Sequence, residues 1–287
     1  MTQRLTEFTN GSYVFDVIDS GPIDGSPLVL LHGFPQRATA WELVVPLLHE
    51  KGFRTIAPDQ RGYSPRARPS RRRDYRAGEL VGDVIALIDA LGVDTVDLVG
   101  HDWGAFVAWA VAARHPDRIT TLTAISVPHP SAFIQAMPRG QLLRSWYMAA
   151  FNLPKLPELF LSKALRPEAG GGARMGLPEP FAGRFYDDIV TSGALTGALN
   201  WYRGMPFWTT DDRATPKVVI PTTYLWSDED FALGKAGARL TATWVDAPYE
   251  FRIVHGADHW LPESRPDDVA AAIIDRAGRP ISAGGGG

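Results

Sequence analysis

The feature that most constrains this chain is a Gly-x-Asp-x-Gly turn at residues 100–104, which separates two apolar runs. The run before it, residues 95–99, predicts a buried strand. The run after it, residues 105–113, is apolar on all sides and predicts a buried helix. Two glycines let the backbone turn sharply from strand to helix, which holds the side chain of Asp102 above the carboxyl edge of a sheet. The turn therefore predicts an α/β fold with a reactive side chain at its tip.

The chemistry of this turn depends on its middle residue. Such turns usually carry serine, which attacks carbonyl groups, but here the residue is Asp102. A carboxylate is a poor nucleophile toward esters and amides, because it leaves more readily than the group it would displace. It can attack a saturated carbon with a strained or good leaving group, giving an alkyl ester that water must then split. The turn therefore favours epoxides or alkyl halides as substrates over lipids or peptides.

Composition excludes several other classes of protein. The 287 residues suffice for one α/β domain with an insertion, and the net charge of −3 gives no overall attraction to nucleic acid or to an anionic membrane. Six arginines within residues 66–76 predict a solvated loop, because no nucleic-acid-binding motif accompanies them. The absence of cysteine excludes disulfides and thiolate-bound metal, and no cofactor is expected. No signal peptide or long apolar run is present, so we expect a cytoplasmic protein. The sequence does not indicate the oligomeric state.

The order of apolar runs predicts the domain organisation. Strand and helix patterns alternate through residues 1–128 and again through 214–282, and Asn10-Gly11 predicts a hairpin near the start. Between them, residues 129–213 are helical, rich in proline and aromatic, and we call this stretch the cap segment. We expect it to lie over the carboxyl edge of the sheet, where open α/β sheets bind ligands. Residues 283–287 predict a flexible tail.

An alkyl ester on Asp102 needs a base that activates water. His259 follows the last predicted strand and is the candidate base. A histidine in this role needs a carboxylate to fix its tautomer and stabilise its charged form, and Asp230, just past the preceding strand, is the candidate. Asp228 is the alternative acid. The chain order Asp102, Asp230, His259 is the nucleophile–acid–histidine order of the α/β-hydrolase fold.

Attack of water on the ester places negative charge on an oxygen of Asp102, which backbone N–H groups must stabilise. One donor is predicted to be Trp103, the residue after the nucleophile, and the other Phe34, in the loop after the third strand. The Phe34-Pro35 peptide bond is a candidate for the cis form. His32 is predicted to support this loop, and His101 to be structural.

Four segments together carry a family resemblance. They are His32-Gly33-Phe34-Pro35, Asp59-Gln60-Arg61-Gly62-Tyr63, Gly100-His101-Asp102-Trp103-Gly104-Ala105, and the late pair Asp230 and His259. Over nearly its whole length the chain resembles the epoxide hydrolases of the α/β-hydrolase fold. The resemblance implies a mostly parallel eight-stranded sheet flanked by helices, with an inserted helical cap. It also implies that Tyr202, in Asn200-Trp201-Tyr202-Arg203, donates a proton to the epoxide oxygen.

The chain departs from the family in the cap segment. A second cap tyrosine is expected just before a Phe-Gln-x-Pro-like run, but Ala150 stands there, before Phe151-Asn152-Leu153-Pro154. Tyr147, nearly one helical turn earlier, is a candidate replacement. We predict that Tyr147, Trp146 and Phe151 contact the substrate. The many aromatic residues of the cap segment favour a small-molecule substrate, namely a bulky apolar or aromatic epoxide, with water as the second reactant.

Two alternative functions remain open. A hydrolytic haloalkane-type dehalogenase would use the same nucleophile, but these enzymes often have Asn after His-Gly, where this chain has Phe34. A biosynthetic tailoring hydrolase or a ligand-binding protein could keep the same fold. A panel of epoxides and haloalkanes distinguishes these functions. An epoxide hydrolase would release diol and a dehalogenase would release halide, whereas neither product would favour the tailoring hydrolase or the binding protein.

Overall fold

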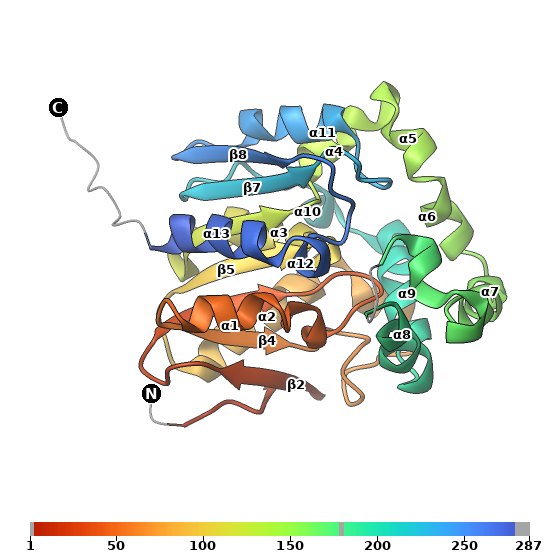
Figure 1. The fold of residues 1–287 in the computed structure, drawn as a ribbon, viewed down its shortest axis with the longest axis horizontal. Helices are drawn as coiled ribbons and strands as arrows, with labels where there is room; N and C mark the ends of the chain where they lie inside the picture. Colours follow the sequence, from red (N-terminus) through yellow and green to blue (C-terminus); the bar gives the residue numbers. More distant parts are fainter. Residues whose placement is uncertain (1–2, 178–180, 279–287) are drawn as a thin grey trace.

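The computed structural model describes residues 3–177 and 181–278. Its centre is one eight-stranded sheet in the order β1-β2-β4-β3-β5-β6-β7-β8 (Figure 1). Strand β2 runs antiparallel to both of its neighbours, and β3 to β8 run parallel to one another. This confirms the mostly parallel eight-stranded sheet. The strands are β1 (Glu7–Asn10), β2 (Tyr13–Ser20), β3 (Ser26–Leu31), β4 (Phe53–Pro58), β5 (Val96–His101), β6 (Ile119–Ile125), β7 (Thr222–Ser227) and β8 (Tyr249–Val254).

The first two strands form the hairpin that the sequence predicted. Asn10 pairs with Tyr13 across the turn, and Gly11 has a φ of +59°. A positive φ is readily adopted by glycine, which explains the Asn-Gly signal.

Helices cover both faces of the sheet, so its central strands are apolar on both sides. Helices α1 (Val44–His49) and α13 (Pro266–Ala277) lie in front of the sheet in Figure 1, and α2 (Ala77–Leu91) and α3 (Trp103–Arg114) pack behind it. Along β3, Leu28 and Leu30 join the core under α1 and α13, whereas Val29 and Leu31 join the core under α2 and α3.

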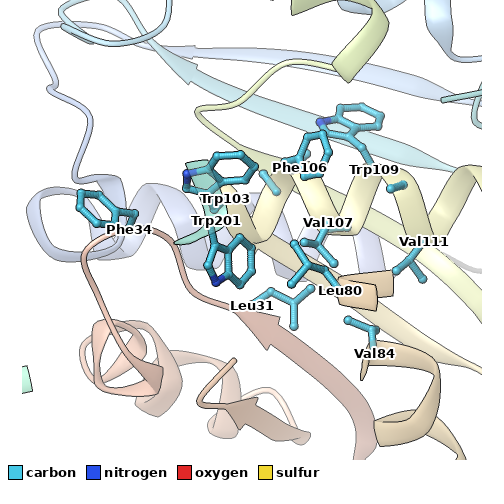
Figure 2. Packing of buried hydrophobic residues seen from close by; sticks show 14 of the residues in the cluster. Leu31, Phe34, Leu80, Val84, Trp103, Phe106, Val107, Trp109, Val111 and Trp201 are labelled. Atoms are coloured by element: carbon cyan, nitrogen blue, oxygen red, sulfur yellow. The ribbon is translucent and has the colours of Figure 1, made fainter. Parts of the chain in front are cut away.

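Helix α3 is buried over almost its whole length, as its uniformly apolar sequence predicted. In Figure 2, Val107 and Val111 face Leu80 and Val84 of α2, while Trp109 points to another side of α3. Packing on several sides fixes α3, and therefore the residue before it, Asp102, relative to the sheet.

Between β6 and β7 the alternation of strands and helices stops. Among the described residues seven α-helices follow one another there, and α5 to α9 gather beyond the carboxyl ends of the parallel strands (Figure 1). The proposed boundaries at 128/129 and 213/214 stay a prediction, and residues 283–287 lie outside the described residues. The helices are α4 (Pro130–Ala136), α5 (Gln141–Arg144), α6 (Trp146–Phe151), α7 (Leu156–Ala164), α8 (Phe181–Phe185), α9 (Leu195–Gly204) and α10 (Thr210–Arg213); α11 (Lys235–Leu240) and α12 (Leu261–Ser264) come after β7 and β8.

Helix α9 joins the cap segment to the loop after β4. The indole Nε1 of Trp201 donates a hydrogen bond of 2.7 Å to the carbonyl oxygen of Arg61. Gly197 lies against Gly62 so closely that a Cβ atom on Gly197 would collide with the Gly62 backbone. The cap segment therefore meets this loop through direct contact of two main chains.

None of the helices in the described part of the chain is long and apolar enough to cross a membrane.

Candidate active site

Asp102 lies at the turn between β5 and α3 in a strained conformation. Its φ is +51° and its ψ is −121°, a combination that side chains with a Cβ atom rarely adopt. Glycines make this turn possible: a Cβ atom on Gly104 would collide with the Leu31 carbonyl, and one on Gly33 would collide with the Asp102 side chain. Only the smallest residue fits at these two positions, and the close packing holds the carboxylate at the edge of the sheet.

The side chains of Asp102, Asp230 and His259 meet in one buried cluster. His259 Nδ1 lies 2.8 Å from Asp230 Oδ2, and His259 Nε2 lies 3.5 Å from Asp102 Oδ2. Asp230 Oδ1 accepts hydrogen bonds from the backbone N–H groups of Ala232 and Leu233, which fix the carboxylate. The imidazole thus lies between two carboxylates.

The alternative acid, Asp228, lies elsewhere. It pairs with His255 Nδ1 at 2.7 Å and accepts a hydrogen bond from the N–H of Gly256. His255 is exposed, and neither it nor Asp228 belongs to the buried cluster.

The loop after β3 supplies a donor to Asp102. The backbone N–H of Phe34 donates a hydrogen bond of 2.8 Å to Asp102 Oδ1, and the Phe34-Pro35 peptide bond is cis. Trp103 is the first residue of α3, so its backbone N–H belongs to the first helical turn, which has no acceptor within the helix. One oxygen of Asp102 is therefore held by the backbone, and the other faces His259.

Two buried histidines support the cluster from behind. His32 Nε2 accepts from the N–H of Gln60, and its carbonyl accepts from the Gln60 side chain, which ties the Phe34 loop to the loop after β4. His101 Nε2 bonds the carbonyl oxygen of His259 at 2.9 Å. Burial lowers the pKa of each ring to about 4, so both are neutral at pH 7.

The electrostatics of the cluster favour a charge-separated resting state. Burial alone would raise the pKa of Asp102, but the hydrogen bond and positive charge of His259, together with the Phe34 N–H, hold this pKa below its ordinary value. Burial alone would lower the pKa of His259, but the charge of Asp230 and the hydrogen bond to Asp102 raise it to about 10. At pH 7 the site therefore holds an imidazolium beside an ionised carboxylate.

A cavity of about 240 Å³ opens onto Asp102. Its wall is mostly apolar and combines α3 of the core with α4, α6 and α9 of the cap segment. Besides Asp102 the lining residues are Trp103, Phe106, Val127, Pro130, Phe133, Ile134, Met137, Tyr147, Met148, Tyr202, Met205, Trp208, Asp212, Arg213 and Leu233.

Two phenols line this cavity together. The rings of Tyr147 and Tyr202 are 6.1 Å apart, and the Tyr202 ring lies 5.1 Å from that of Trp103. Burial and the negative charge of Asp102 both raise the pKa of each tyrosine, so both phenols remain protonated near the carboxylate.

The other residues predicted to contact substrate lie outside the cavity wall. Trp146 is 69% exposed on the outer side of α6. Phe151 packs against Phe34, Tyr147 and Tyr202 without lining the cavity. Ala150 does not line it either, so α6 presents Tyr147, and not position 150, to the cavity.

Several wall residues were not predicted from the sequence. Phe106 lies one helical turn after Trp103 and its ring stacks on Trp208 at 5.0 Å, so helical spacing from Trp103 could have identified it. The three methionines, Met137, Met148 and Met205, carry no comparable signal, because they come from separate short helices and turns.

Over residues 3–177 and 181–278, no group of three or more His, Cys, Asp or Glu side chains is arranged to hold a metal ion.

Comparisons with known proteins agree with this geometry. A family model described as the alpha/beta hydrolase fold matches residues 26–266. Epoxide hydrolase 3 of Xenopus tropicalis is 36% identical over 276 residues, which cover 91% of this chain and 74% of that protein. Epoxide hydrolase A of Mycobacterium tuberculosis is 31% identical over 96% of each chain.

Solved structures give the same result. One of a group described as novel epoxide hydrolases of the alpha/beta hydrolase superfamily, from metagenomes of hot environments, superimposes with a TM-score of 0.80 and 29% identity. The match covers 96% of this chain and 99% of that one. The fold and site therefore define an enzyme of the α/β-hydrolase class. Within that class the chain belongs to the epoxide hydrolase family, which confirms the resemblance seen in the sequence.

Proposed function

We propose that this protein hydrolyses an epoxide to a vicinal diol through a covalent ester on Asp102. The observation that carries the proposal is the environment of the carboxylate: the Phe34 N–H holds Oδ1, His259 faces Oδ2, and two phenols share the cavity beside it. The family membership supports epoxide as the substrate class. The apolar and aromatic wall favours a bulky apolar or aromatic epoxide.

In the first step, Asp102 Oδ2 attacks an epoxide carbon, and the carbon–oxygen bond of the ring breaks. The alkoxide that leaves is too basic to depart unaided, so Tyr202, assisted by Tyr147, donates a proton to it. The result is an alkyl ester on Asp102 and one phenolate. Raised tyrosine pKa values suit this role, because the acid must hold its proton until the alkoxide forms.

In the second step, the ester is hydrolysed. Ester formation removes the charge of Asp102, which had helped to raise the pKa of His259. The imidazolium then releases its proton, which restores the phenol, and neutral His259 accepts a proton from water as the water attacks the ester carbon. The Phe34 and Trp103 N–H groups stabilise the oxyanion. Collapse expels the diol alkoxide, which takes the proton from His259, and the newly formed carboxylic acid of Asp102 reprotonates His259.

The test is a mass measurement on a trapped ester. In His259→Gln the first step should proceed and the second should stop, so the intact protein should gain the mass of one epoxide. His255→Gln, which alters the exposed His255–Asp228 pair, should hydrolyse the same epoxide without accumulating an adduct. If an epoxide accepted by the wild type leaves no adduct on His259→Gln, the two-step mechanism is wrong.

A single turnover in water labelled with heavy oxygen gives an independent test. Because water attacks the ester carbon, the label should enter the carboxylate of Asp102 and be absent from the first diol. Label in that diol would mean direct attack of water on the epoxide. The same substrate panel should include haloalkanes, since release of halide without diol would identify the dehalogenase alternative.

A further inference from the structure

The outer surface of the cap segment carries apolar side chains where a soluble helix normally has polar ones. On α7, the residues on the outward face are Leu156, Leu159, Phe160 and Lys163, all exposed, while Leu161 points inward and is buried. Their spacing of three and four residues is that of one helical face. A helix that is apolar on its outer as well as its inner face is unusual at a water-facing surface.

The same pattern continues on the two preceding helices. Leu142 and Leu143 of α5 are 65% and 81% exposed, and Trp146 of α6 is 69% exposed. Leu153, in the linker to α7, is also exposed. Helices α5, α6 and α7 contact one another in sequence order and follow the outer edge of the cap segment (Figure 1). We call these seven side chains the outer apolar patch: Leu142, Leu143, Trp146, Leu153, Leu156, Leu159 and Phe160.

The segment that carries this patch is rich in cationic side chains. Residues 139–166 contain five cationic side chains and one carboxylate, although the whole chain has a net charge of −3. The single carboxylate, Glu158, is already paired with Arg203 at 2.6 Å. All five cations are exposed, and no carboxylate of the described residues lies within ion-pair distance of them. They are Arg139, Arg144, Lys155, Lys163 and Arg166.

The combination identifies the surface that would cover the patch. Exposed Leu, Phe and Trp side chains among Lys and Arg are typical of helices that lie in the interface of a bilayer with anionic lipids. A second copy fits less well, because a twofold dimer through this face would bring together the same cations, which have no carboxylate partner among the described residues.

The position of α6 connects the patch to the cavity. Trp146 faces outward, whereas the next two residues, Tyr147 and Met148, line the cavity that contains Asp102. Ile134, another cavity residue, is itself 55% exposed. Apolar surface therefore runs from the outside of the cap segment to the cavity wall.

We propose that the outer apolar patch docks this protein on the surface of a bilayer that contains anionic phospholipids. The leucine and phenylalanine side chains enter the interface, and the five cations bind the lipid headgroups. An apolar substrate that partitions into the bilayer would then reach the cavity without crossing bulk water. The docking itself does not depend on the reaction at Asp102.

Flotation with vesicles tests the proposal on the full-length protein. Wild type should float with vesicles made of equal amounts of phosphatidylcholine and phosphatidylglycerol, less with phosphatidylcholine alone, and less when salt is added. Leu143→Ser combined with Phe160→Ser should lower the partition coefficient at least about tenfold. The matched control is Ile18→Ser combined with Val219→Ser, which changes two exposed apolar side chains outside the cap segment. This variant should float as the wild type does.

Charge reversal gives a second arm. Lys155→Glu with Lys163→Glu should lower partitioning by about tenfold or more, since two cations near the lipid surface are replaced by carboxylates. Arg71→Glu with Arg72→Glu makes the same change of net charge in an exposed loop outside the cap segment. It should lower partitioning only by the smaller amount that the change in net charge alone causes. Asp102→Asn should float as wild type, so failure of docking and failure of the proposed reaction are distinguishable.

Three results would overturn the proposal. They are absence of wild-type flotation with the anionic vesicles, equal loss in patch and control variants, and a dimer by light scattering that the Leu143→Ser and Phe160→Ser pair dissociates. The last result would assign the patch to a second copy of the chain.

Discussion

Glu263 is a buried carboxyl group that the proposed reaction does not use. It lies on α12, four residues after His259, and accepts a hydrogen bond from the side chain of Gln36, two residues after Phe34. Arg184 of the cap segment approaches it at 3.8 Å. Among the described residues, Glu263 Oε2 and Gln36 Oε1 are buried without a partner. When Glu263 is ionised, these two oxygen atoms can only accept hydrogen bonds. Protonation of Glu263 supplies the O–H donor that they lack.

Burial raises the pKa of Glu263 from 4.5 to about 8. Because the folded protein binds this proton more tightly than the unfolded chain, the stabilisation is fully present below pH 4.5 and is lost as the pH rises through 8. The glutamine side chain in Glu263→Gln is neutral at every pH, so this variant should not show the same loss of stability. We therefore expect the free energy of unfolding of wild type to fall relative to Glu263→Gln between pH 4.5 and 8, by a few kcal/mol, since a tenfold change in a protonation constant corresponds to about 1.4 kcal/mol.

Urea unfolding at a series of pH values measures this difference. Glu50→Gln, at an exposed position, should follow the pH dependence of wild type. A difference between wild type and Glu263→Gln that is constant from pH 4.5 to 8 would mean that Glu263 is ionised in the folded protein throughout.

At the scale of elements, α6 decides which cap side chain reaches the substrate. This helix has only six residues, and it presents Tyr147 and Met148 to the cavity while Trp146 faces outward. Position 150, where a tyrosine was expected from the resemblance, does not line the cavity. Tyr147 is therefore our candidate for the second proton donor beside Tyr202.

We expect Tyr147→Phe to slow epoxide opening by roughly tenfold to a hundredfold, because a positioned general acid contributes about 10²-fold or more and Tyr202 would remain. The rate of adduct formation on His259→Gln isolates the epoxide-opening step, and it is measured by rapid quenching and intact-protein mass spectrometry. Adding Ala150→Tyr to Tyr147→Phe should not restore the rate, since residue 150 does not line the cavity. The control is Tyr186→Phe, which removes a phenol of the cap segment that lies outside the cavity wall. Restoration by Ala150→Tyr would show that a tyrosine at position 150 also reaches the substrate, and Tyr147 would then not be the required donor.

The elements also show what a sequence can predict. Strands such as β3 are apolar on both faces, and the Asn10-Gly11 turn and the glycines around Asp102 are local signals, so the sheet and its strand-to-helix turn follow from short stretches of sequence. The proximity of Asp230 and His259 follows from their positions after neighbouring parallel strands, β7 and β8.

The cap segment is less predictable for a physical reason. Its helices have only four to ten residues, so helical periodicity covers fewer than three turns and does not fix which face is inward. Trp146 and Tyr147 are adjacent aromatics with opposite environments, and only the packing of α6 against α9 distinguishes them. Glu263 and Gln36 are far apart in the chain, and no local signal links them.

At the scale of the whole molecule, the reaction depends on how the cap segment sits on the core. Asp102, the proposed nucleophile, comes from the core and both phenols come from the cap segment, so a small displacement between the two parts would separate them. The contact of Gly197 with Gly62 and the hydrogen bond from Trp201 to the Arg61 carbonyl fix α9, which carries Tyr202.

Gly197→Ala tests this dependence. Its new methyl group would collide with the Gly62 backbone, which cannot rotate away as a side chain can, so α9 must shift. We expect a loss of roughly 1–3 kcal/mol in the free energy of unfolding, as for other overpacked sites. Epoxide opening should also slow, because the Tyr202 phenol would move away from Asp102. The matched control is Gly183→Ala on α8, where a Cβ atom meets no atom of the described residues within 4 Å, so helix propensity should raise stability by up to about 1 kcal/mol. Thermal unfolding and single-turnover rates measure both effects. If Gly197→Ala and Gly183→Ala have the same thermal stability and the same single-turnover rate, the close contact of the two main chains does not position the cap segment for catalysis.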